Sequence, residues 1–486
     1  MSQEDNSGLT EGNVSRSEEL PTNTPRRALF AFDDEFGDRT KSPLKLLEES
    51  FAEDIQKLSM QKSPPSADED RLAGPPISIR FRVPPVGAPA HDVFGDALYT
   101  IFQQLLTKGP PAEFCHWLAY LIATTVEREN ETVWQNVKYT KGVYETEGTV
   151  EAKKLFSKSM LTVIEKIMQK AAEDELFKVP EKWSGMHISA EQRKGSRNKQ
   201  EDRFFAYPNG QYMNHGEDKI GVLAVFDGHG GSECSQYAAS HFWEEWIKMR
   251  IQHEDDLVQA LVSTLNSLDE RMTKRSEVES WKGGTTAVTC AIDMEKKEMV
   301  FAWLGDSAGF VMSTLEFKKV TRDHSPSDPE EARRVEEAGG QVMLIGGELR
   351  VNGVLNLTRA LGDVQGRPMI SNESESVKLD IHDNDYLVLL ACDGVTDVFN
   401  TSDLYNLVEA FVAEHSPEEY NDLANYICKQ AMDAGSGDNV TVVIGFLRHP
   451  VHVWNLLKDD DDDDDVPIVV PTDQSSHAIP DERNRY

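Results

Sequence analysis

The sequence is poor in basic residues and has no long apolar run. Lysine and arginine number 50 against 84 aspartates and glutamates, which gives a formal net charge of −34 over 486 residues. So acidic a chain is repelled by nucleic-acid phosphates and anionic lipid surfaces, and no local basic patch offsets the repulsion. No run of about 18 apolar residues is present, so no transmembrane helix is predicted. These absences argue against nucleic-acid and membrane binding.

Paired cysteines are also absent. The cysteines are scattered, odd in number, mostly in apolar contexts and without a CxxC pair: Cys115, Cys234, Cys290, Cys392 and Cys428. They are typical of reduced core residues and not of a disulfide framework. The opening residues, MSQEDNSGLTEGN, are polar and acidic, and are not expected to act as a signal peptide. We therefore expect an intracellular, cytoplasmic protein.

The length and local composition predict two or more domains with tails. Residues 1–75, rich in Ser, Pro, Glu and Asp, are expected to be a mostly disordered acidic tail. Within them, 42–58 has apolar residues at helical spacing and predicts a short amphipathic helix, which either docks on another protein or packs on its own chain. Residues 450–486 contain the self-repelling run Asp459–Asp465 and predict a second disordered acidic tail.

Residues 76–173 show a helical pattern. Apolar stripes recur at 93–106, 114–122 and 155–168, which predicts a small all-helical domain able to fill a core of its own. A separate module of this kind suggests partner binding. On this interpretation, a fragment that starts near Asp174 would fold without the helical domain.

Residues 174–449 change to short β-rich runs that alternate with helices. The runs at 283–293, 298–307, 308–314 and 316–321 are separated by turn-length gaps and predict one antiparallel meander. Helical stretches are expected at 231–250, 256–274, 328–338, 402–414 and 418–433. Strands in runs and helices in blocks indicate an α+β fold.

Two of the β-rich runs end in the same way. LAVFDGHGG places Asp227 and Gly228 at a strand end, and LACDGVTDV does the same with Asp393 and Gly394. A single Asp-Gly is usually a turn, but a buried lone charge is costly, and two such ends suggest a shared cation. Further acids lie at strand ends or in Gly-flanked turns: Glu201, Asp202, Asp306, Asp363, Asp397 and Asp438. An all-oxygen set favours Mg²⁺, Mn²⁺ or Ca²⁺.

Such a set suggests phosphate chemistry. So many carboxylates cannot all ionise without cations, and a water shared by two such ions is a nucleophile near neutral pH. A phosphate monoester is a fitting substrate. Arg197, upstream of the first acid pair, could grip its phosphate through parallel hydrogen bonds. His229 could protonate the leaving oxygen, because an imidazole pKa near 6.5 suits that task.

The ordered motifs carry a family resemblance. They are KGSRNKQED, VFDGHGG, GGTTAV, LGDS, TRDHSP, RALGD, ACDGVTDV and GSGDNVTVVI, over residues 183–448. The set resembles the metal-dependent serine/threonine phosphatases of the protein phosphatase 2C family. The resemblance implies a central β-sandwich of two antiparallel sheets flanked by helices, with two Mg²⁺ or Mn²⁺ ions at one end and an optional third.

Site roles follow from that resemblance. Asp227 would bridge both ions, with Gly228 and Glu201 helping to hold one, and Asp393 and Asp438 the other. Asp306 and Asp363 would lie near the third ion. The chain departs from the family at Gln200, usually Met, and at Thr396, usually aromatic, but neither position supplies a ligand.

The N-terminal half narrows the resemblance. IRFRVPPVGAPAHDVFGDALYTIFQQLLTKG and FCHWLAYLIAT resemble a subgroup that includes phosphatases of nematode sex determination and phosphatases acting on calmodulin-dependent kinases. Phosphoproteins would be the substrates, and by resemblance other feminisation-pathway proteins would bind the helical domain. The alternative is a scaffold or adaptor in a signalling or ubiquitin-ligase complex, with catalysis secondary.

Overall fold

The computed structural model describes residues 93–106, positions 115, 116, 119, 120 and 123, and 186–462 except 209–219, 255 and 315. The helix predicted within 42–58, the stripe at 155–168, most of the stripe at 114–122 and the end of the chain lie outside these residues. No helix of the described part is both long and apolar enough to cross a membrane. None of the five cysteines forms a disulfide, and all five are buried.

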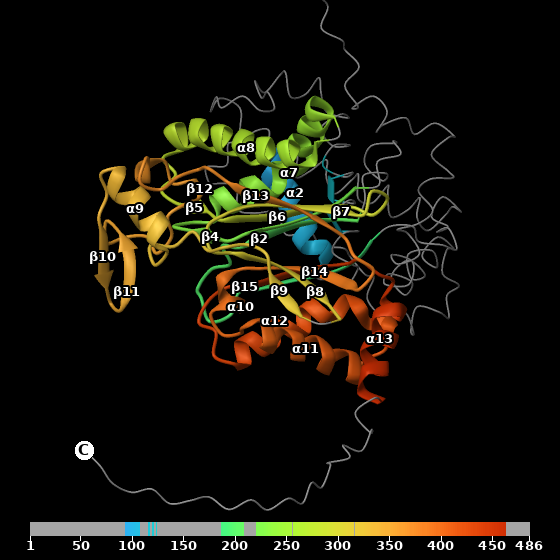
Figure 1. Ribbon diagram of the computed structural model, residues 1–486. Coiled ribbons are helices and arrows are strands. Elements are labelled where there is room, and N and C mark those ends of the chain that lie inside the picture. The colour runs from blue at the N-terminus through green and yellow to red at the C-terminus, as the bar shows by residue number, and fades with distance from the viewer. Residues whose placement is uncertain are drawn as a thin grey trace, which may run out of the picture.

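Two five-stranded antiparallel sheets pack face to face and form the centre of the molecule (Figure 1). In sheet order, the first holds β13 (Glu375–Asp380), β7 (Glu298–Leu304), β6 (Ala287–Asp293), β3 (Ile220–Phe226) and β2 (Arg203–Tyr207). The second holds β1 (His187–Arg193), β15 (Val440–Phe446), β14 (Asp385–Ala391), β8 (Ala308–Ser313) and β9 (Phe317–Lys319). The α+β class and the antiparallel sheets agree with the expectation.

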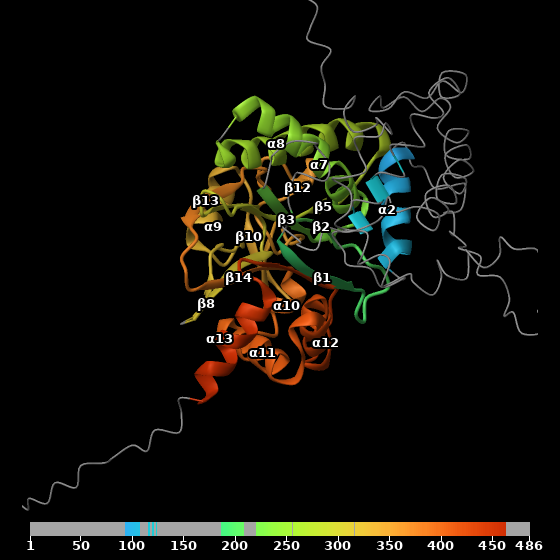
Figure 2. The same ribbon diagram turned by 90° about the vertical axis from the view of Figure 1, so that its right-hand side faces the viewer.

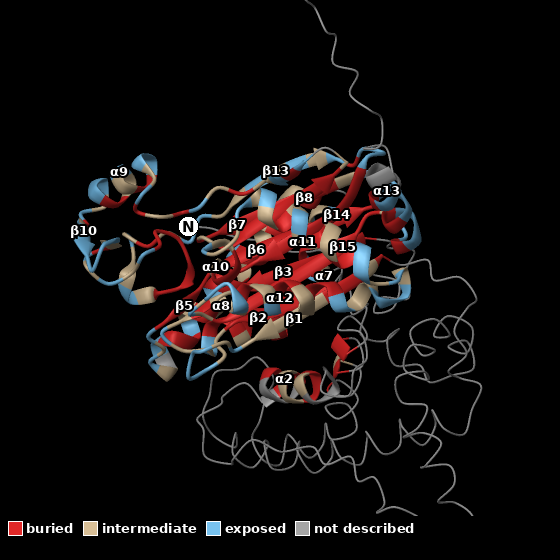
Figure 3. Ribbon diagram, turned by 90° about the horizontal axis from the view of Figure 1, so that it is seen from below, coloured by how far each residue is buried: buried red, intermediate tan, exposed pale blue. Residues whose placement is uncertain are grey.

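Helices cover the outer face of each sheet (Figure 1). The hairpin of α7 (Glu233–His253) and α8 (Leu257–Glu279) lies over the first sheet, and the second is covered by α11 (Thr401–Glu414), α12 (Leu423–Asp433) and α13 (Pro450–Asp462). A strand between a sheet and a helix layer is buried on both faces, so its sequence is continuously apolar. Every residue of β3 (IGVLAVF) and of β14 (DYLVLLA) is buried, whereas the edge strand β13 alternates. Figure 3 shows this buried core in red.

The predicted single meander is wrong at one junction. β6 pairs with β7, and β8 with β9, but β7 and β8 belong to different sheets. The chain crosses at Gly305, whose φ of 102° is accessible to glycine and rarely to other residues. A side chain there would also meet Thr286 at 2.6 Å. Asp306 therefore lies where the chain passes from one sheet to the other.

A small subdomain projects from the strand ends. It contains α9 (Pro329–Glu337) and the hairpin of β10 (Val342–Ile345) with β11 (Glu348–Val351). Its own small apolar cluster includes Val335, Val351 and Ile370. Short strands join it to the sandwich near the predicted acids: β4 (Gly228–His229), β5 (Gly284–Thr285) and β12 (Leu361–Gly362). The one-turn helix α10 (Asp393–Thr396) follows β14 directly.

The described helix of the N-terminal region is α2 (Val93–Leu106), as the stripe at 93–106 predicts. This helix packs against the two-sheet part of the molecule. Its apolar side chains, Phe94, Leu98, Ile101 and Phe102, belong to the same hydrophobic cluster as both sheets. The ring centroid of Phe102 lies 5.4 Å from that of Phe204 in β2. The expectation that this stripe fills a core of its own is therefore wrong, because its apolar side chains are buried in the common core with the two sheets.

The C-terminal border also differs from the prediction. Residues 450–462, assigned to a disordered tail, form α13, and the helix includes the first aspartates of the acidic run. Val453, Trp454 and Leu457 are buried at helical spacing in the common core. The Trp454 indole N–H donates to the His415 carbonyl at 2.9 Å. Apolar packing thus outweighs the charge repulsion that made this segment resemble a tail.

Candidate active site

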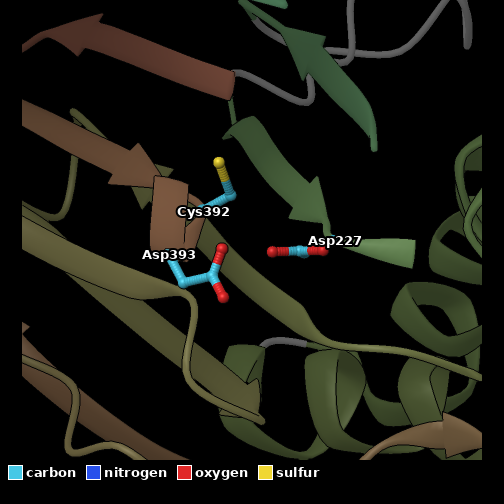
Figure 4. A group of neighbouring side chains, drawn as sticks. All are labelled: Asp227, Cys392 and Asp393. Carbon is cyan, nitrogen blue, oxygen red and sulfur yellow. The ribbon is translucent and has the colours of Figure 1, made fainter. Parts of the chain in front are cut away.

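Two strand ends from different sheets bring Asp227 and Asp393 together. Asp227 follows β3 of the first sheet, and Asp393 begins α10 immediately after β14 of the second. Carboxylate oxygens of both, with the Cys392 sulfur, lie within 4.8 Å of one another. Figure 4 shows the two carboxylates side by side. The two Asp-Gly strand ends therefore lie close together, as a shared cation would require, and the cation itself stays a prediction.

The acids at the centre of this cluster face one another more than they face positive charge. Burial, with Asp202, Asp393 and Asp306 nearby, raises the pKa of Asp227 well above its usual range. Burial and the Asp306 and Asp438 charges do the same to the pKa of Asp393. Burial also raises the pKa of Asp202 and that of Asp306, each to about 6. Like charges this close are tolerable only if protons or cations neutralise them.

The donor set suits hard divalent cations. Carboxylate oxygens dominate it, and such ligands are preferred by Mg²⁺ and Mn²⁺. The one soft donor, the Cys392 thiol, already accepts the Thr441 N–H at 3.1 Å and donates toward the Asn439 carbonyl at 3.5 Å. Burial raises its pKa well above the ordinary range, which disfavours the thiolate that metals require. The cluster therefore matches oxygen-liganded ions better than zinc.

Glu201 and Gly228 lie beside each other next to Asp227. A side chain at Gly228 would meet the Glu201 carbonyl oxygen at 2.5 Å, so only glycine permits this approach. The Glu201 N–H donates to the Asn439 side-chain oxygen at 2.8 Å, and the Ser235 hydroxyl donates to the Glu201 carbonyl. Both predicted ligand positions are thus held close to the acid cluster.

Asp438 and Arg197 form an ion pair at the rim of the cluster. The Arg197 guanidinium donates to the Asp438 carboxylate at 2.5 Å and to the Gly437 carbonyl at 3.3 Å. The Arg197 side chain is 58% exposed. The predicted phosphate clamp therefore contacts a predicted metal ligand, and its guanidinium remains accessible from solvent.

His229 is held by Asp363, with 2.6 Å between the Nε2 atom and the carboxylate oxygen. Burial alone lowers the pKa of His229, but the hydrogen bond and charge of Asp363 outweigh it, so the net pKa is raised. A raised pKa favours the protonated ring, which is the form an acid catalyst requires. The Asp363 carboxylate contacts His229, and Asp306 lies among the central acids. Their expected place near a third ion stays a prediction.

Two residues support the site in ways that the sequence motifs did not predict. Asp202, almost fully buried, accepts the Thr441 hydroxyl at 2.7 Å and adds negative charge beside Asp227. Asn439 donates to the carbonyls of Lys194 and Lys199, both at 2.9 Å, and so fixes the loop that carries Glu201. Asp202 was already among the candidate acids, without this role, and Asn439 was indicated only by its position next to Asp438.

This two-sheet fold, with an acid cluster spanning its seam, agrees with a family assignment. The family model described as "Protein phosphatase 2C" matches residues 186–440, more than half of the chain. The chain belongs to the protein phosphatase 2C family and is a metal-dependent protein serine/threonine phosphatase.

Individual proteins similar to this chain support the same family assignment. "Protein phosphatase fem-2" of Caenorhabditis elegans is 57% identical over 432 residues, 88% of this chain and 95% of that protein. "Protein phosphatase 1E" of Homo sapiens is 29% identical over 361 residues, 74% of this chain and 46% of that protein. The solved "Structure of a C.elegans sex determining protein" matches with a TM-score of 0.73 and 55% identity, covering 87% of this chain and 100% of that one.

Proposed function

We propose that Asp227, Gly228, Glu201, Asp393 and Asp438 hold two Mg²⁺ or Mn²⁺ ions during hydrolysis of phosphoserine and phosphothreonine in proteins. The observation that carries this assignment is the pair of half-buried carboxylates Asp227 and Asp393, whose oxygens lie within 4.8 Å of each other at the ends of two different sheets. When bound, the ions supply Lewis-acid activation of the attacking water and neutralise the phosphoryl oxygens. A third ion near Asp306 belongs to the same proposal.

Arg197 and His229 are proposed to act on the two ends of the phosphate ester. Arg197 lies at the exposed rim, where its planar guanidinium can exchange the Asp438 carboxylate for a phosphate. His229, protonated and oriented by Asp363, donates its proton to the leaving serine or threonine oxygen. Asp363 acts here as a positioning residue.

Metal removal tests the proposal directly. Phosphate release from phosphoserine and phosphothreonine peptides should require added Mg²⁺ or Mn²⁺, at about millimolar concentration because such ions keep several waters and are loosely held. The measurement is phosphate release against metal concentration after exhaustive dialysis with chelator. Unchanged turnover in excess chelator would contradict the metal assignment.

Substitution at Arg197 and His229 should separate binding from chemistry. Arg197→Ala should mainly raise KM, by about tenfold, because it removes a charge-assisted contact. His229→Ala should mainly lower kcat, by about a hundredfold for alkyl phosphates and far less for aryl phosphates, whose leaving oxygens need no proton. Steady-state kinetics on both substrate types measure the difference. Identical defects in the two variants would refute these roles.

The biological setting rests on the relatives. One similar solved protein is called a sex determining protein of C. elegans, and we propose a role for this chain in a corresponding signalling pathway, within the cell. Residues 76–173 are proposed as a helical partner-binding domain before the phosphatase domain, with other proteins of that pathway as partners. The scaffold alternative is not favoured, because each predicted ligand position retains its donor.

A further inference from the structure

The segment that carries Glu201 has no regular structure of its own and depends on side chains for its position. Residues 200–202 precede β2, and the Arg203 guanidinium turns back to bind this segment. Its Nη1 donates to the Gln200 carbonyl at 2.8 Å and to the Asp202 carbonyl at 2.6 Å. Arg203 thus bridges the carbonyl groups of the two residues on either side of the proposed ligand Glu201.

Arg203 is a buried cation. The residue is 5% exposed, and burial lowers the pKa of its guanidinium despite the nearby charges of Asp202, Glu201 and Glu233. Its Nη2 lies 3.5 Å from the side-chain oxygen of Gln236 in α7. A buried guanidinium needs its remaining faces covered, because an uncovered face admits water that competes for its hydrogen bonds.

Tyr99 of α2 supplies that cover. The Arg203 Cζ atom lies 4.0 Å from the centroid of the Tyr99 ring, a cation–π distance. The helix that presents the ring is fixed independently: the Ser240 hydroxyl of α7 donates to the Gly95 carbonyl at 3.2 Å, and Phe102 packs on Phe204. Figure 2 shows α2 beside α7 and β2. Helix α2 of the N-terminal region therefore contacts Arg203, the residue that holds the segment carrying Glu201.

We propose that Tyr99 and Arg203 are positioning residues that couple the docking of α2 to the metal site. Tyr99 holds the Arg203 guanidinium in place, and Arg203 holds the backbone on both sides of Glu201. This inference rests on the proposed role of Glu201 as a metal ligand. It gives the N-terminal region a role in metal affinity in addition to partner binding.

The test measures Mn²⁺ binding to the full chain by electron paramagnetic resonance, without substrate. Tyr99→Leu keeps an apolar side chain but removes the ring face, and should weaken Mn²⁺ binding by about three- to tenfold, the equivalent of one cation–π contact. Tyr99→Phe keeps the ring face and should bind Mn²⁺ as the wild type does. Turnover of an aryl phosphate at saturating Mn²⁺ should stay within about twofold for both variants, since the chemical groups are intact.

Phe94→Leu is the matched control. Phe94 lies on the same helix and is more deeply buried than Tyr99, but its ring packs against Tyr120 and His241. This variant should lower the melting temperature while leaving Mn²⁺ affinity unchanged. Equal loss of affinity in Phe94→Leu would mean general loosening of α2 and would overturn the proposal, as would wild-type affinity in Tyr99→Leu.

Arg203→Lys examines the contact from its other side. Lysine keeps the charge but cannot bridge both carbonyls, so Mn²⁺ affinity should fall by about tenfold or more. Unchanged affinity in this folded variant would refute the coupling even if Tyr99→Leu failed to fold. Failure of the underlying metal assignment looks different: wild type and Asp227→Asn would then titrate with Mn²⁺ identically.

Discussion

Asp227→Asn should lower kcat by about a thousandfold or more. The carboxylate is proposed to bridge both ions, and a metal centre contributes several kcal/mol of transition-state stabilisation at 1.36 kcal/mol per tenfold. Phosphopeptide turnover at saturating Mn²⁺ measures the loss. Asp383→Asn is the matched control, since Asp383 is 84% exposed and pairs with Lys297 instead of the cluster. Near-normal kcat in Asp227→Asn would contradict the assignment.

The same variant should be more stable than the wild type when metal is absent. Burial and neighbouring acids raise the pKa of Asp227 in the folded state, so ionisation of this group opposes folding at any pH above its unfolded pKa. Asparagine removes that penalty, and the melting temperature in chelator at pH 7 should rise by about 3 °C or more. The gain should vanish below about pH 4, where the carboxyl is protonated in both states. A lower melting temperature at pH 7 would show that the cluster is not electrostatically strained.

A chain that begins at Asp174 should be markedly less stable than the full protein. Removing α2 uncovers Phe204, on which Phe102 packs, and takes Phe94, Leu98, Ile101 and Phe102 out of the common core. Four buried apolar side chains represent about 6–12 kcal/mol of gross burial, part of which is offset by the entropy of ordering the helix. We expect a melting temperature lower by about 10 °C or more, with increased binding of an apolar dye.

The control for this truncation is a chain that lacks only residues 1–75, which removes the predicted acidic tail and leaves α2 in place. Its melting temperature and its aryl-phosphate turnover should match those of the full chain. A fragment starting at Asp174 with full stability and full turnover would restore the interpretation of two independent folding units. Differential scanning calorimetry and aryl-phosphate kinetics on the three proteins distinguish these outcomes.

The strands and their terminal acids were predictable because burial on both faces makes them continuously apolar. β3 and β14 are such runs, and an Asp directly after each can only lie at the same edge if the strands pack together. Local sequence did not reveal which sheet β8 would join, because turn length between β7 and β8 is the same for a hairpin and for a crossing. Gly305 was the only local sign of the crossing.

The other features that the sequence did not predict share one physical cause, which is packing between residues far apart in the sequence. The α2 sequence is amphipathic whether the helix packs within its own domain or against another one. The pattern therefore could not predict that α2 packs on β2. In α13, the helical spacing of Val453, Trp454 and Leu457 was masked by the run Asp459–Asp465, which begins inside the helix. The partner of His229 depended on Asp363 being brought close by the pairing of β5 with β12, which no local pattern indicates.

The position of the acid cluster across the seam has a consequence for biosynthesis. Asp227 comes from one sheet and Asp393 from the other, with 166 positions between them along the chain. A nascent or damaged molecule with one sheet formed holds only part of the proposed donor set, so the proposed two-ion site is incomplete. Ion binding then favours the closed sandwich by mass action. Phosphatase activity is therefore expected only in molecules in which both sheets have formed.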